Sequence, residues 1–180
     1  MAQLPREKLE KMYDKVGNFH EGLAWVQLGD KQFHIREDGS RAYERNFGYV
    51  GDFHEGLAAA RTAGKNKWCH IDHNGKRAYR KSYDEVGDFH EGLAPARIGL
   101  SSFHIHHDGS RAYTQSYNQV GDFHEGLAPA SFRGTEFHIH HNGKRAYEHE
   151  FDEVEDFHGG IAVACIGDAW FPINLQGERA

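Results

Sequence analysis

The stretch Phe19-His20-Glu21-Gly22-Leu23-Ala24 decides the fold, because it returns along the chain at nearly constant spacing. Intact copies begin at Phe53, Phe89 and Phe123, and a degraded copy, Phe157-His158-Gly159-Gly160-Ile161-Ala162, follows them. The steps between the copies are 34, 36, 34 and 34 residues. A period of this length is the signature of a repeat protein, in which each unit buries its apolar face against its neighbours.

Two further blocks keep the same register. An aromatic-His-Ile block begins at Phe33, Cys69, Phe103, Phe137 and Phe171, with variation in the second and last copies. The third block, Gly-x-Arg-Ala-Tyr, ends at Tyr43, Tyr79, Tyr113 and Tyr147. A two-residue insertion around Gly64-Lys65-Asn66 explains the one longer step. The three blocks together predict five units at about 13–46, 47–82, 83–116, 117–150 and 151–180. Residues 1–12 form an N-terminal extension, with a helix candidate from Arg6 to Met12 opened by Pro5.

Each unit reads as short strands joined by turns. Phe103 and Ile105 alternate with histidines, which is the period of a strand, and Asp108-Gly109 and Asn142-Gly143 are hairpin signals. The sequence therefore predicts an all-β protein of five tandem antiparallel β units. The predicted repeat framework consists of Phe19, Phe53, Phe89, Phe123, Phe157, His20, His54, His90, His124, Gly22, Gly56, Gly92, Gly126, Tyr43, Tyr79, Tyr113 and Tyr147.

The order Tyr-Asp-x-Val-x-x-Phe-x-Glu-Gly-Leu-Ala, followed by an aromatic-x-Ile strand and Asp/Asn-Gly, resembles the bacterial WG-containing repeat, also called the KWG repeat. The resemblance runs from about Tyr13 to Ala180. The Trp-Gly pair of that family is missing, although Lys67-Trp68 keeps a tryptophan near its place, so the chain looks like a divergent, histidine-bearing version. The resemblance implies an all-β repeat array and no particular activity.

Five units suit a closed five-bladed propeller-like ring or an open β-solenoid. The closed ring is favoured, because the last unit stops at Gly177-Glu178-Arg179-Ala180 and the segment Tyr13-Asp14-Lys15-Val16-Gly17 would complete it. A fragment of a longer protein is the alternative. Units of this length are short for four-stranded blades, so blades of three strands or two hairpins are expected.

Composition excludes several classes of protein. The net charge is -6 and no Lys/Arg block is present, which argues against nucleic-acid binding. No apolar run is long enough to span a membrane, and the start Met1-Ala2-Gln3-Leu4-Pro5-Arg6-Glu7 lacks the apolar run of a signal peptide. We therefore expect a cytoplasmic protein. Cys69 and Cys165 form no disulfide framework and are expected to be core or semi-buried thiols.

Histidine recurs at two positions of the repeat. The two series are His20, His54, His90, His124 and His158, and His34, His70, His104 and His138. The structural interpretation is an imidazole packed beside a phenylalanine, with one nitrogen bonded to a neighbouring backbone group. The alternative is a metal site for Zn²⁺ or Ni²⁺ at His104, His106, His138 and His140, because residues i and i+2 share one face of a strand. No other cofactor is predicted.

A catalytic site is not expected. His90 and Glu91 are sequence neighbours, so on a strand they would point to opposite faces. The sequence contains neither a phosphate-binding loop nor a nucleophile elbow. The arginines of the third block, Arg41 among them, are expected to pair with Asp52, Asp88, Asp122 and Asp156, with an anionic ligand as the alternative. Trp25, Trp68 and Trp170 suggest packing or a stacking surface.

Three functions remain open. The favoured one is a non-enzymatic repeat module for binding or scaffolding, which contacts a protein partner of unknown identity through loops on one rim. The second is a multivalent binder of a small ligand such as a glycan, with equivalent pockets between units. The third is a histidine-based metal binder. The oligomeric state is left open by the sequence.

Overall fold

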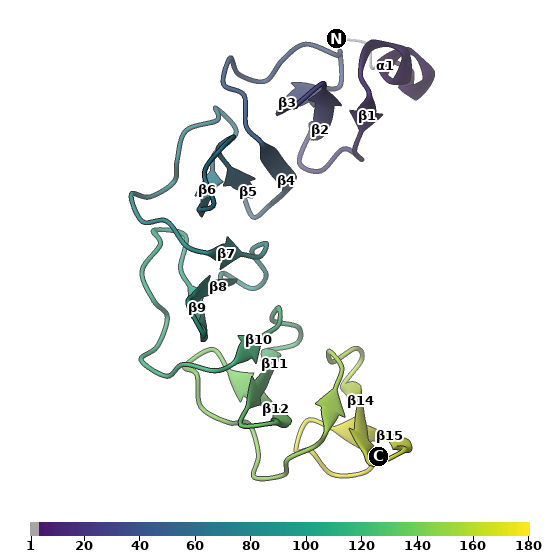
Figure 1. The fold of residues 1–180 in the computed structure, drawn as a ribbon. Coiled ribbons are helices and arrows are strands. Elements are labelled where there is room, and N and C mark those ends of the chain that lie inside the picture. The colour runs from purple at the N-terminus through teal and green to yellow at the C-terminus, as the bar shows by residue number, and fades with distance from the viewer. Residues whose placement is uncertain (1–3) are drawn as a thin grey trace. The chain divides into compact units, whose positions relative to one another are not determined.

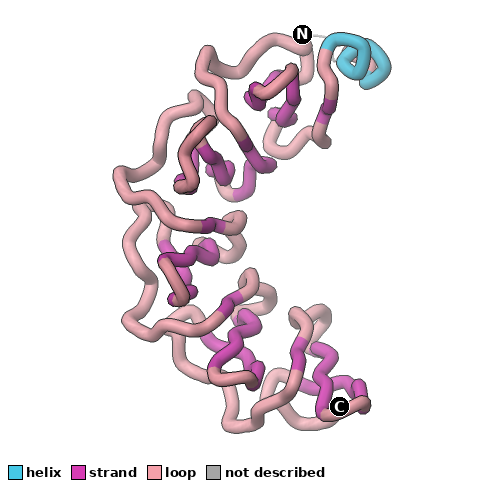
Figure 2. The backbone as a smooth tube through the Cα atoms, viewed as in Figure 1, coloured by secondary structure: helices cyan, strands magenta, loops and turns pink. Residues whose placement is uncertain are grey.

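The computed structural model describes residues 4–180, which form one short helix and a succession of short antiparallel strands (Figure 1). Most of the backbone between the strands is turn and loop (Figure 2). The elements are α1 (Arg6–Met12), β1 (Lys15–Val16), β2 (Leu23–Leu28), β3 (Lys31–Arg36), β4 (Tyr49–His54), β5 (Leu57–Arg61), β6 (Trp68–Ile71), β7 (Glu85–Val86), β8 (Ala94–Ile98), β9 (Ser101–Ile105), β10 (Gln119–Val120), β11 (Leu127–Phe132), β12 (Thr135–His140), β13 (Glu153–Val154), β14 (Ile161–Ile166) and β15 (Ala169–Asn174).

The strands of residues 4–180 fall into five three-stranded sheets whose strand order follows the sequence. The expectation of all-β repeats with three-stranded blades is therefore confirmed. The chain divides into two compact units, Met1–Asp88 and Phe89–Ala180. The boundaries predicted for the five repeats stay predictions, and so does the choice between a closed ring and an open array. The predicted extension 1–12 contains α1, while its first three residues lie outside the described part of the chain.

In the first unit, the sheets β1-β2-β3 and β4-β5-β6 hold two consecutive repeats. The β2–β3 hairpin pairs Leu23 with Arg36 and Leu28 with Lys31. A further pair of backbone hydrogen bonds, both 2.9 Å, joins Gln32 of β3 to Phe47 of the next repeat. Each repeat is therefore connected to its neighbour through the outer edge of its third strand.

The second unit repeats this plan in β10-β11-β12 and β13-β14-β15, preceded by the β8–β9 hairpin. Ser102 bonds to Tyr117 through two backbone hydrogen bonds of 2.9 Å, and Glu136 bonds to Phe151 in the same way. Phe123 and Phe157 are almost fully buried. The apolar framework positions thus form cores that consecutive repeats share, as the sequence predicts.

A tyrosine of one repeat covers the turn glycine of the next. A Cβ atom built on Gly75 would lie 2.7 Å from the ring of Tyr43, and one on Gly143 would lie 2.4 Å from the ring of Tyr113. Both glycines also have positive φ, as the turn after the third strand requires. Glycine is therefore needed in these Asp/Asn-Gly turns for two reasons. It adopts the positive φ of the turn, and its lack of a side chain leaves room for the neighbouring tyrosine ring.

Helix α1 packs on the first repeat where a preceding repeat would supply its tyrosine. A Cβ atom on Gly39 would approach Leu4 at 3.0 Å and Leu9 at 3.4 Å, and Leu9 is fully buried. Arg6 fastens the helix by donating to the carbonyl of Val16 at 2.9 Å. Among residues 4–180, no helix has the length and apolar character needed to cross a bilayer.

Candidate functional site

The Phe-His-Glu-Gly-Leu-Ala block forms a tight turn. His20 and Leu23 exchange backbone hydrogen bonds of 2.8 and 3.0 Å, and the two residues between them, Glu21 and Gly22, have φ values of 50° and 78°. Positive φ at both central positions defines a type I′ turn. Our expectation that the His-Glu pair lies within a strand is wrong, because Glu21 and Gly22 reverse the chain, although in the second repeat His54 is the last residue of β4. The framework glycines Gly22, Gly56, Gly92 and Gly126 all have positive φ.

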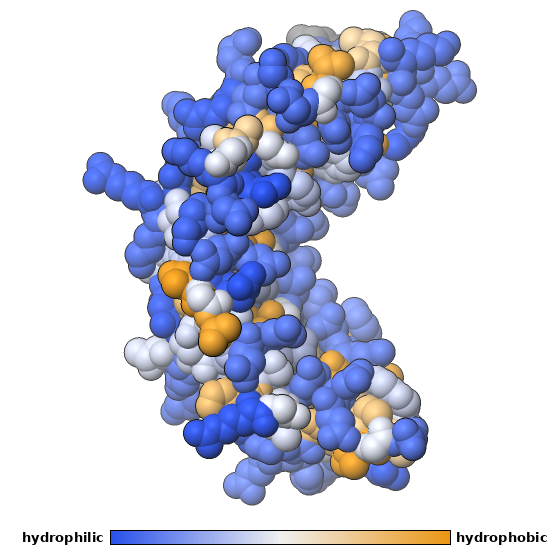
Figure 3. Space-filling model, in the orientation of Figure 1, coloured by the Kyte–Doolittle hydropathy of each residue, from blue (hydrophilic) through white to orange (hydrophobic). Residues whose placement is uncertain are grey.

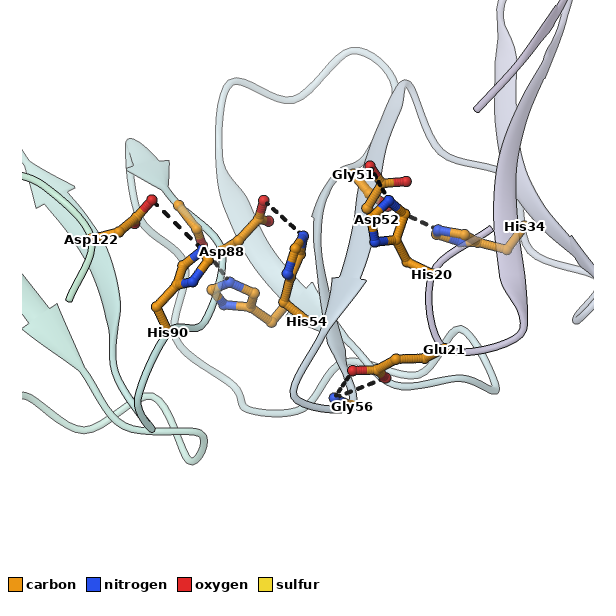
Figure 4. Close-up of polar contacts among 12 residues, drawn as sticks. His20, Glu21, His34, Gly51, Asp52, His54, Gly56, Asp88, His90 and Asp122 are labelled. Atoms are coloured by element: carbon orange, nitrogen blue, oxygen red, sulfur yellow. Dashed lines mark hydrogen bonds and ion pairs between the residues drawn. The ribbon is translucent and has the colours of Figure 1, made fainter. Parts of the chain in front are cut away.

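The glutamate of one turn binds the next turn. The carboxylate of Glu21 accepts a hydrogen bond of 3.0 Å from the amide of Gly56 (Figure 4). In the second unit, Glu91 accepts from the amide of Gly126 at 3.0 Å. Glu125 accepts from the amides of Gly160 and Gly159, and these two bonds lower the pKa of its carboxyl. Each of these glutamates therefore fastens consecutive repeats together.

A third histidine series supports these turns, and we did not single it out in the sequence. His73 stacks on Phe53 with a centroid distance of 4.3 Å and lies 3.1 Å from the carboxylate of Glu21. His141 stacks on Phe123 in the same way and lies 3.2 Å from Glu91. The sequence signal was present, since His73, His107 and His141 each stand directly before the Asp/Asn-Gly pair.

The first histidine series lies beside aspartates, and we call these residues the histidine–aspartate rows. In the first unit, Nε2 of His20 is 3.7 Å from Oδ2 of Asp52, and His54 and Asp88 show the same separation (Figure 4). In the second unit, the pairs are His90–Asp122 at 3.7 Å and His124–Asp156 at 3.8 Å. These separations suit an ion pair when the imidazole is protonated, but they exceed hydrogen-bond length.

The imidazoles of each row are also neighbours. The ring centroids of His20 and His54 are 5.5 Å apart. In the second unit, His124 has His90 on one side at 5.4 Å and His158 on the other at 5.5 Å. The rings are partly exposed, so each row brings titratable groups of both signs to the surface of its unit.

The predicted pairing of Arg41 with an aspartate is wrong. The guanidinium of Arg41 lies 3.8 Å above the ring of Phe33 and donates to the side chain of Asn46 at 2.7 Å. Arg111 stacks on Phe103 at 3.9 Å in the same way. A planar guanidinium can stack on an aromatic face while its edge binds loop oxygens, so the repeat uses arginine to brace its own loop. The aspartates face histidines instead.

The second histidine series is buried and fully hydrogen-bonded. Nε2 of His34 donates to the carbonyl of Gly51 at 2.9 Å, and its ring centroid lies 4.6 Å from that of Phe53. The structural interpretation of this series, a ring beside phenylalanine with a nitrogen on the backbone, is confirmed. Burial lowers the pKa of His34, His104 and His138 to about 4, although the backbone hydrogen bond opposes the shift.

The four predicted metal ligands lie in two different environments. Both ring nitrogens of His104 are hydrogen-bonded, to the hydroxyl of Tyr113 at 2.6 Å and to the carbonyl of Gly121 at 2.8 Å. His138 is held by Tyr147 and by a backbone carbonyl in the same way. His106 and His140 are exposed. Within residues 4–180, no group of three or more His, Cys, Asp and Glu side chains is arranged to hold a metal ion.

A Zn²⁺ or Ni²⁺ site at these four histidines would have to displace the bonds of His104 and His138. The metal-binding hypothesis therefore stays a prediction, and it requires the loss of these buried hydrogen bonds.

A pocket opens beside the row of the second unit. Its volume is about 480 Å³ and it is lined by Gly121, Asp122, Pro129, Val154, Glu155, Asp156 and His158. Pro129 packs over Gly121, where an added Cβ would be 2.6 Å from the proline ring. In the first repeat, Trp25 stands at the position of Pro129 and packs over Gly17 at 2.3 Å from the corresponding Cβ position.

These positions show that the spaces between consecutive repeats differ in their lining. The packing interpretation holds for Trp25, and Trp68 packs on Tyr49 with a centroid distance of 5.0 Å. Trp170 is half exposed. Cys69 and Cys165 are buried free thiols, as expected.

Comparison with families and known proteins supports the repeat interpretation. The family model described as WG containing repeat matches residues 6–31, 43–68, 71–99 and 139–170, which together make up more than half of the chain. No curated protein matches the chain.

Two solved structures illustrate the fold likeness, and both proteins are β-propeller-like. Hsv2 of Kluyveromyces lactis is 12% identical with a TM-score of 0.58, over 88% of this chain and 59% of that one. Virginiamycin B lyase of Staphylococcus aureus is 14% identical with a TM-score of 0.53, over 92% of this chain and 67% of that one. The chain spans less than two thirds of the Hsv2 chains that it matches. At these identities the likeness concerns the fold alone.

Proposed function

Because the chain belongs to the family of WG-containing repeat proteins, we propose that it is a non-enzymatic module that binds another protein through the tips of its β-hairpins. One observation carries this proposal. In four of the five repeats, the second strand ends in a large apolar residue with a substantially exposed side chain. These residues are Leu28 at 49%, Ile98 at 50%, Phe132 at 37% and Ile166 at 51% exposure.

The apolar tips are concentrated in the second unit. Leu100, in the turn after β8, is 91% exposed and lies two residues from Ile98. The face of the molecule drawn in Figure 3 is largely hydrophilic, with isolated apolar patches. A single exposed leucine is ordinary, but recurrence at one position of the repeat supports a contact surface.

The tips are also held in place. The carboxylate of Asp14 accepts a hydrogen bond of 2.6 Å from the amide of Gly29, and Asp152 binds Gly167 at 2.7 Å. Asn118 accepts from the amide of Arg133 at 2.9 Å. A surface that is ordered before binding loses less conformational entropy when a partner docks, which supports a role in recognition.

The assignment as a non-enzyme is supported by the roles of the repeated polar residues. His34 and His104 are sealed by backbone and tyrosine partners, and Glu21 and Glu91 bind turn amides. These contacts recur in consecutive repeats, so none of them is peculiar to one reacting centre. The lyase activity for which the Staphylococcus aureus protein is named is a property of that protein.

A glycan binder with equivalent pockets stays an alternative prediction, and equilibrium dialysis against a glycan panel tests it. The different linings at Trp25 and Pro129 favour unequal affinities over equivalent sites.

A photo-crosslinking experiment tests the proposed function. A benzophenone amino acid is placed at Leu100 or, as a control, at the exposed Gln115 in a loop of the same unit. We expect one discrete protein adduct from Leu100 and none from Gln115. The protein identified is then purified, and its affinity is measured for the Leu100→Asp and Phe132→Asp variants and for the charge-matched Gln115→Asp control.

The proposal holds if the two tip variants weaken binding about tenfold or more while the control does not, as expected when a carboxylate replaces an apolar anchor. Equal adducts at both positions, or unchanged affinity in the tip variants, would overturn it. Circular dichroism of each variant shows whether the fold is retained.

A further inference from the structure

We infer that the pocket beside the second unit's histidine–aspartate row binds an arginine side chain. The inference rests on the proposed function, because the arginine would belong to the protein partner. The pocket lies between the fourth and fifth repeats, and its volume of about 480 Å³ is within the range of ordinary small-ligand sites. We call it the repeat-4/5 pocket.

Its walls are partly apolar, and neither lysine nor arginine lines them. Pro129 of β11 and Val154 of β13 supply hydrocarbon surface, and Gly121 contributes backbone only. Pro129 can lie over this strand because any side chain at position 121 would collide with its ring. The pocket therefore offers a hydrocarbon wall on which the alkyl stem of a long side chain can pack.

Three carboxylates surround this apolar wall. Asp122 and Asp156 belong to the histidine–aspartate row and recur in the repeats, whereas Glu155 is peculiar to the fifth repeat. The corresponding positions of the other repeats are all glycine: Gly17, Gly51, Gly87 and Gly121. The divergence of the fifth repeat has thus added a third negative charge to a pocket that already contains two.

The backbone around Glu155 is fixed independently of its carboxylate. Its carbonyl accepts the Nε2 proton of His138 at 2.9 Å, and its amide donates to the carbonyl of Val163 at 2.9 Å. The side chain is exposed. Glu155 therefore takes over the backbone role of the glycines in earlier repeats and presents an additional acceptor.

Asp156 is placed to accept hydrogen bonds from a ligand. Its Oδ2 lies 3.8 Å from Nε2 of His124, which is too long for a hydrogen bond. Its side chain is 39% exposed, so water or a ligand can reach it. The carboxylates of Glu155 and Asp156 thus provide acceptors on adjacent residues of one repeat.

A guanidinium fits this combination better than an ammonium group. It is planar, carries five donors in a fixed fork, and binds carboxylates with two parallel hydrogen bonds. It is also weakly hydrated and stacks on flat rings, and the imidazole of His158 lines the same pocket. The overall charge of -6 would favour the approach of a basic segment.

The experiment uses the full chain labelled with ¹⁵N and Nα-acetyl-arginine methylamide as the probe. We expect saturable amide shifts at Gly121, Glu155 and Asp156. The uncharged citrulline analogue should produce no comparable shifts. Glu155→Gln and Asp156→Asn should each weaken binding about tenfold, because each removes a charged hydrogen-bond acceptor.

Glu153→Gln is the matched control, because it removes the same charge from an exposed position two residues away that does not line the pocket. This variant should bind the probe as the wild type does. Equal binding of citrulline, equal weakening by Glu153→Gln, or the absence of saturable shifts would overturn the inference. The amide spectra of the variants also show whether they are folded.

A tip variant separates this inference from the proposed function. Phe132→Asp should bind the arginine probe normally even if it no longer binds the protein partner. If the partner binds through the tips while the wild-type pocket ignores the probe, the arginine pocket fails alone. If the probe binds and the tip variants keep full affinity for the partner, the proposed tip contact fails alone.

Discussion

The hydroxyl of Tyr43 donates a hydrogen bond of 2.6 Å to Nδ1 of His34. The direction of this hydrogen bond follows from the partner of the other nitrogen of the His34 ring. Nε2 faces the carbonyl oxygen of Gly51, which can only accept, so Nε2 carries the proton of a neutral imidazole. The same arrangement recurs at His104 with Tyr113 and Gly121. Three residues from two consecutive repeats thus satisfy one another inside the protein.

Tyr43→Phe should destabilise the protein although it removes only one oxygen atom. The substitution leaves Nδ1 of His34 buried without a donor, and an unsatisfied buried polar atom costs about 1–3 kcal/mol. Urea unfolding, followed by circular dichroism, measures the loss in the free energy of unfolding. Tyr49→Phe is the control, because this hydroxyl belongs to a 40% exposed side chain. A loss of equal size in both variants would contradict the assigned role of the Tyr43 hydroxyl.

Stability should fall in mild acid. In an unfolded chain imidazole has a pKa near 6.5, whereas burial lowers the pKa of His34, His104 and His138 to about 4. Between these values the unfolded state binds more protons than the folded state. The contribution of these histidines is therefore complete above about pH 6.5 and is lost as the pH falls toward 4, with a slope of up to about 1.4 kcal/mol per pH unit for each.

Melting temperatures between pH 7.5 and 5 test this expectation. A His106→Gln/His140→Gln variant serves as the substitution control, because both side chains are exposed and the buried histidines stay in place. Nuclear magnetic resonance titration of the imidazole protons reports the buried rings directly, including in variants of altered stability. A melting temperature that stays constant from pH 7.5 to 5 would contradict the burial of neutral histidines.

The sequence predicts the repeat well because the repeat is local. Register, strand periodicity and the Asp/Asn-Gly turns depend on short-range chemistry, and the helix at Arg6–Met12 follows Pro5 as expected. The Glu-Gly turn was missed because glutamate is an unusual residue at positive φ, and its compensating bond reaches the following repeat. The sequence alone does not indicate this hydrogen bond between consecutive repeats.

Pairing of the charged residues was harder to predict for a similar reason. Arginine and aspartate recur with the same period, so spacing alone is consistent with their pairing. The structure instead stacks Arg41 on Phe33 and places Asp52 beside His20. Which charged side chains pair in a repeat protein depends on the face of the sheet from which each one projects. A period of 34 residues does not specify that face.

Glu125 should have two opposing effects on the contact between the fourth and fifth repeats. Its carboxylate stabilises the contact, and the strain of its positive φ destabilises it. Its φ of 55° is unfavourable for a residue with a Cβ atom, while its carboxylate binds the amides of Gly159 and Gly160. Glu125→Ala loses the bonds and keeps the strain, whereas Glu125→Gly loses the bonds and relieves the strain. We expect the melting temperature to decrease from wild type to Glu125→Gly to Glu125→Ala.

The same residue should contribute to acid sensitivity. Its two amide bonds lower the pKa of the folded carboxyl, so its contribution is present above the unfolded pKa and is lost as the pH falls through the folded value. Glu125→Gln removes this dependence. An alanine variant as stable as the glycine variant would show that the strain is absent, and a wild-type melting temperature in all three variants would refute the carboxylate contact.

Gly143→Ala should be far more damaging than Gly126→Ala, although both glycines have positive φ, 73° and 82°. An alanine at position 126 meets nothing within 4 Å, so its cost is the left-handed backbone alone, about 1–2 kcal/mol. At position 143 the new Cβ would lie 2.4 Å from the ring of Tyr113, whose hydroxyl also holds His104. The ring cannot move away without breaking that bond. Denaturant unfolding measures the free energy of unfolding of both variants, and the difference between them gives the cost of the clash with Tyr113. Equal losses of free energy in the two variants would mean that the position of the Tyr113 ring does not require a glycine at position 143.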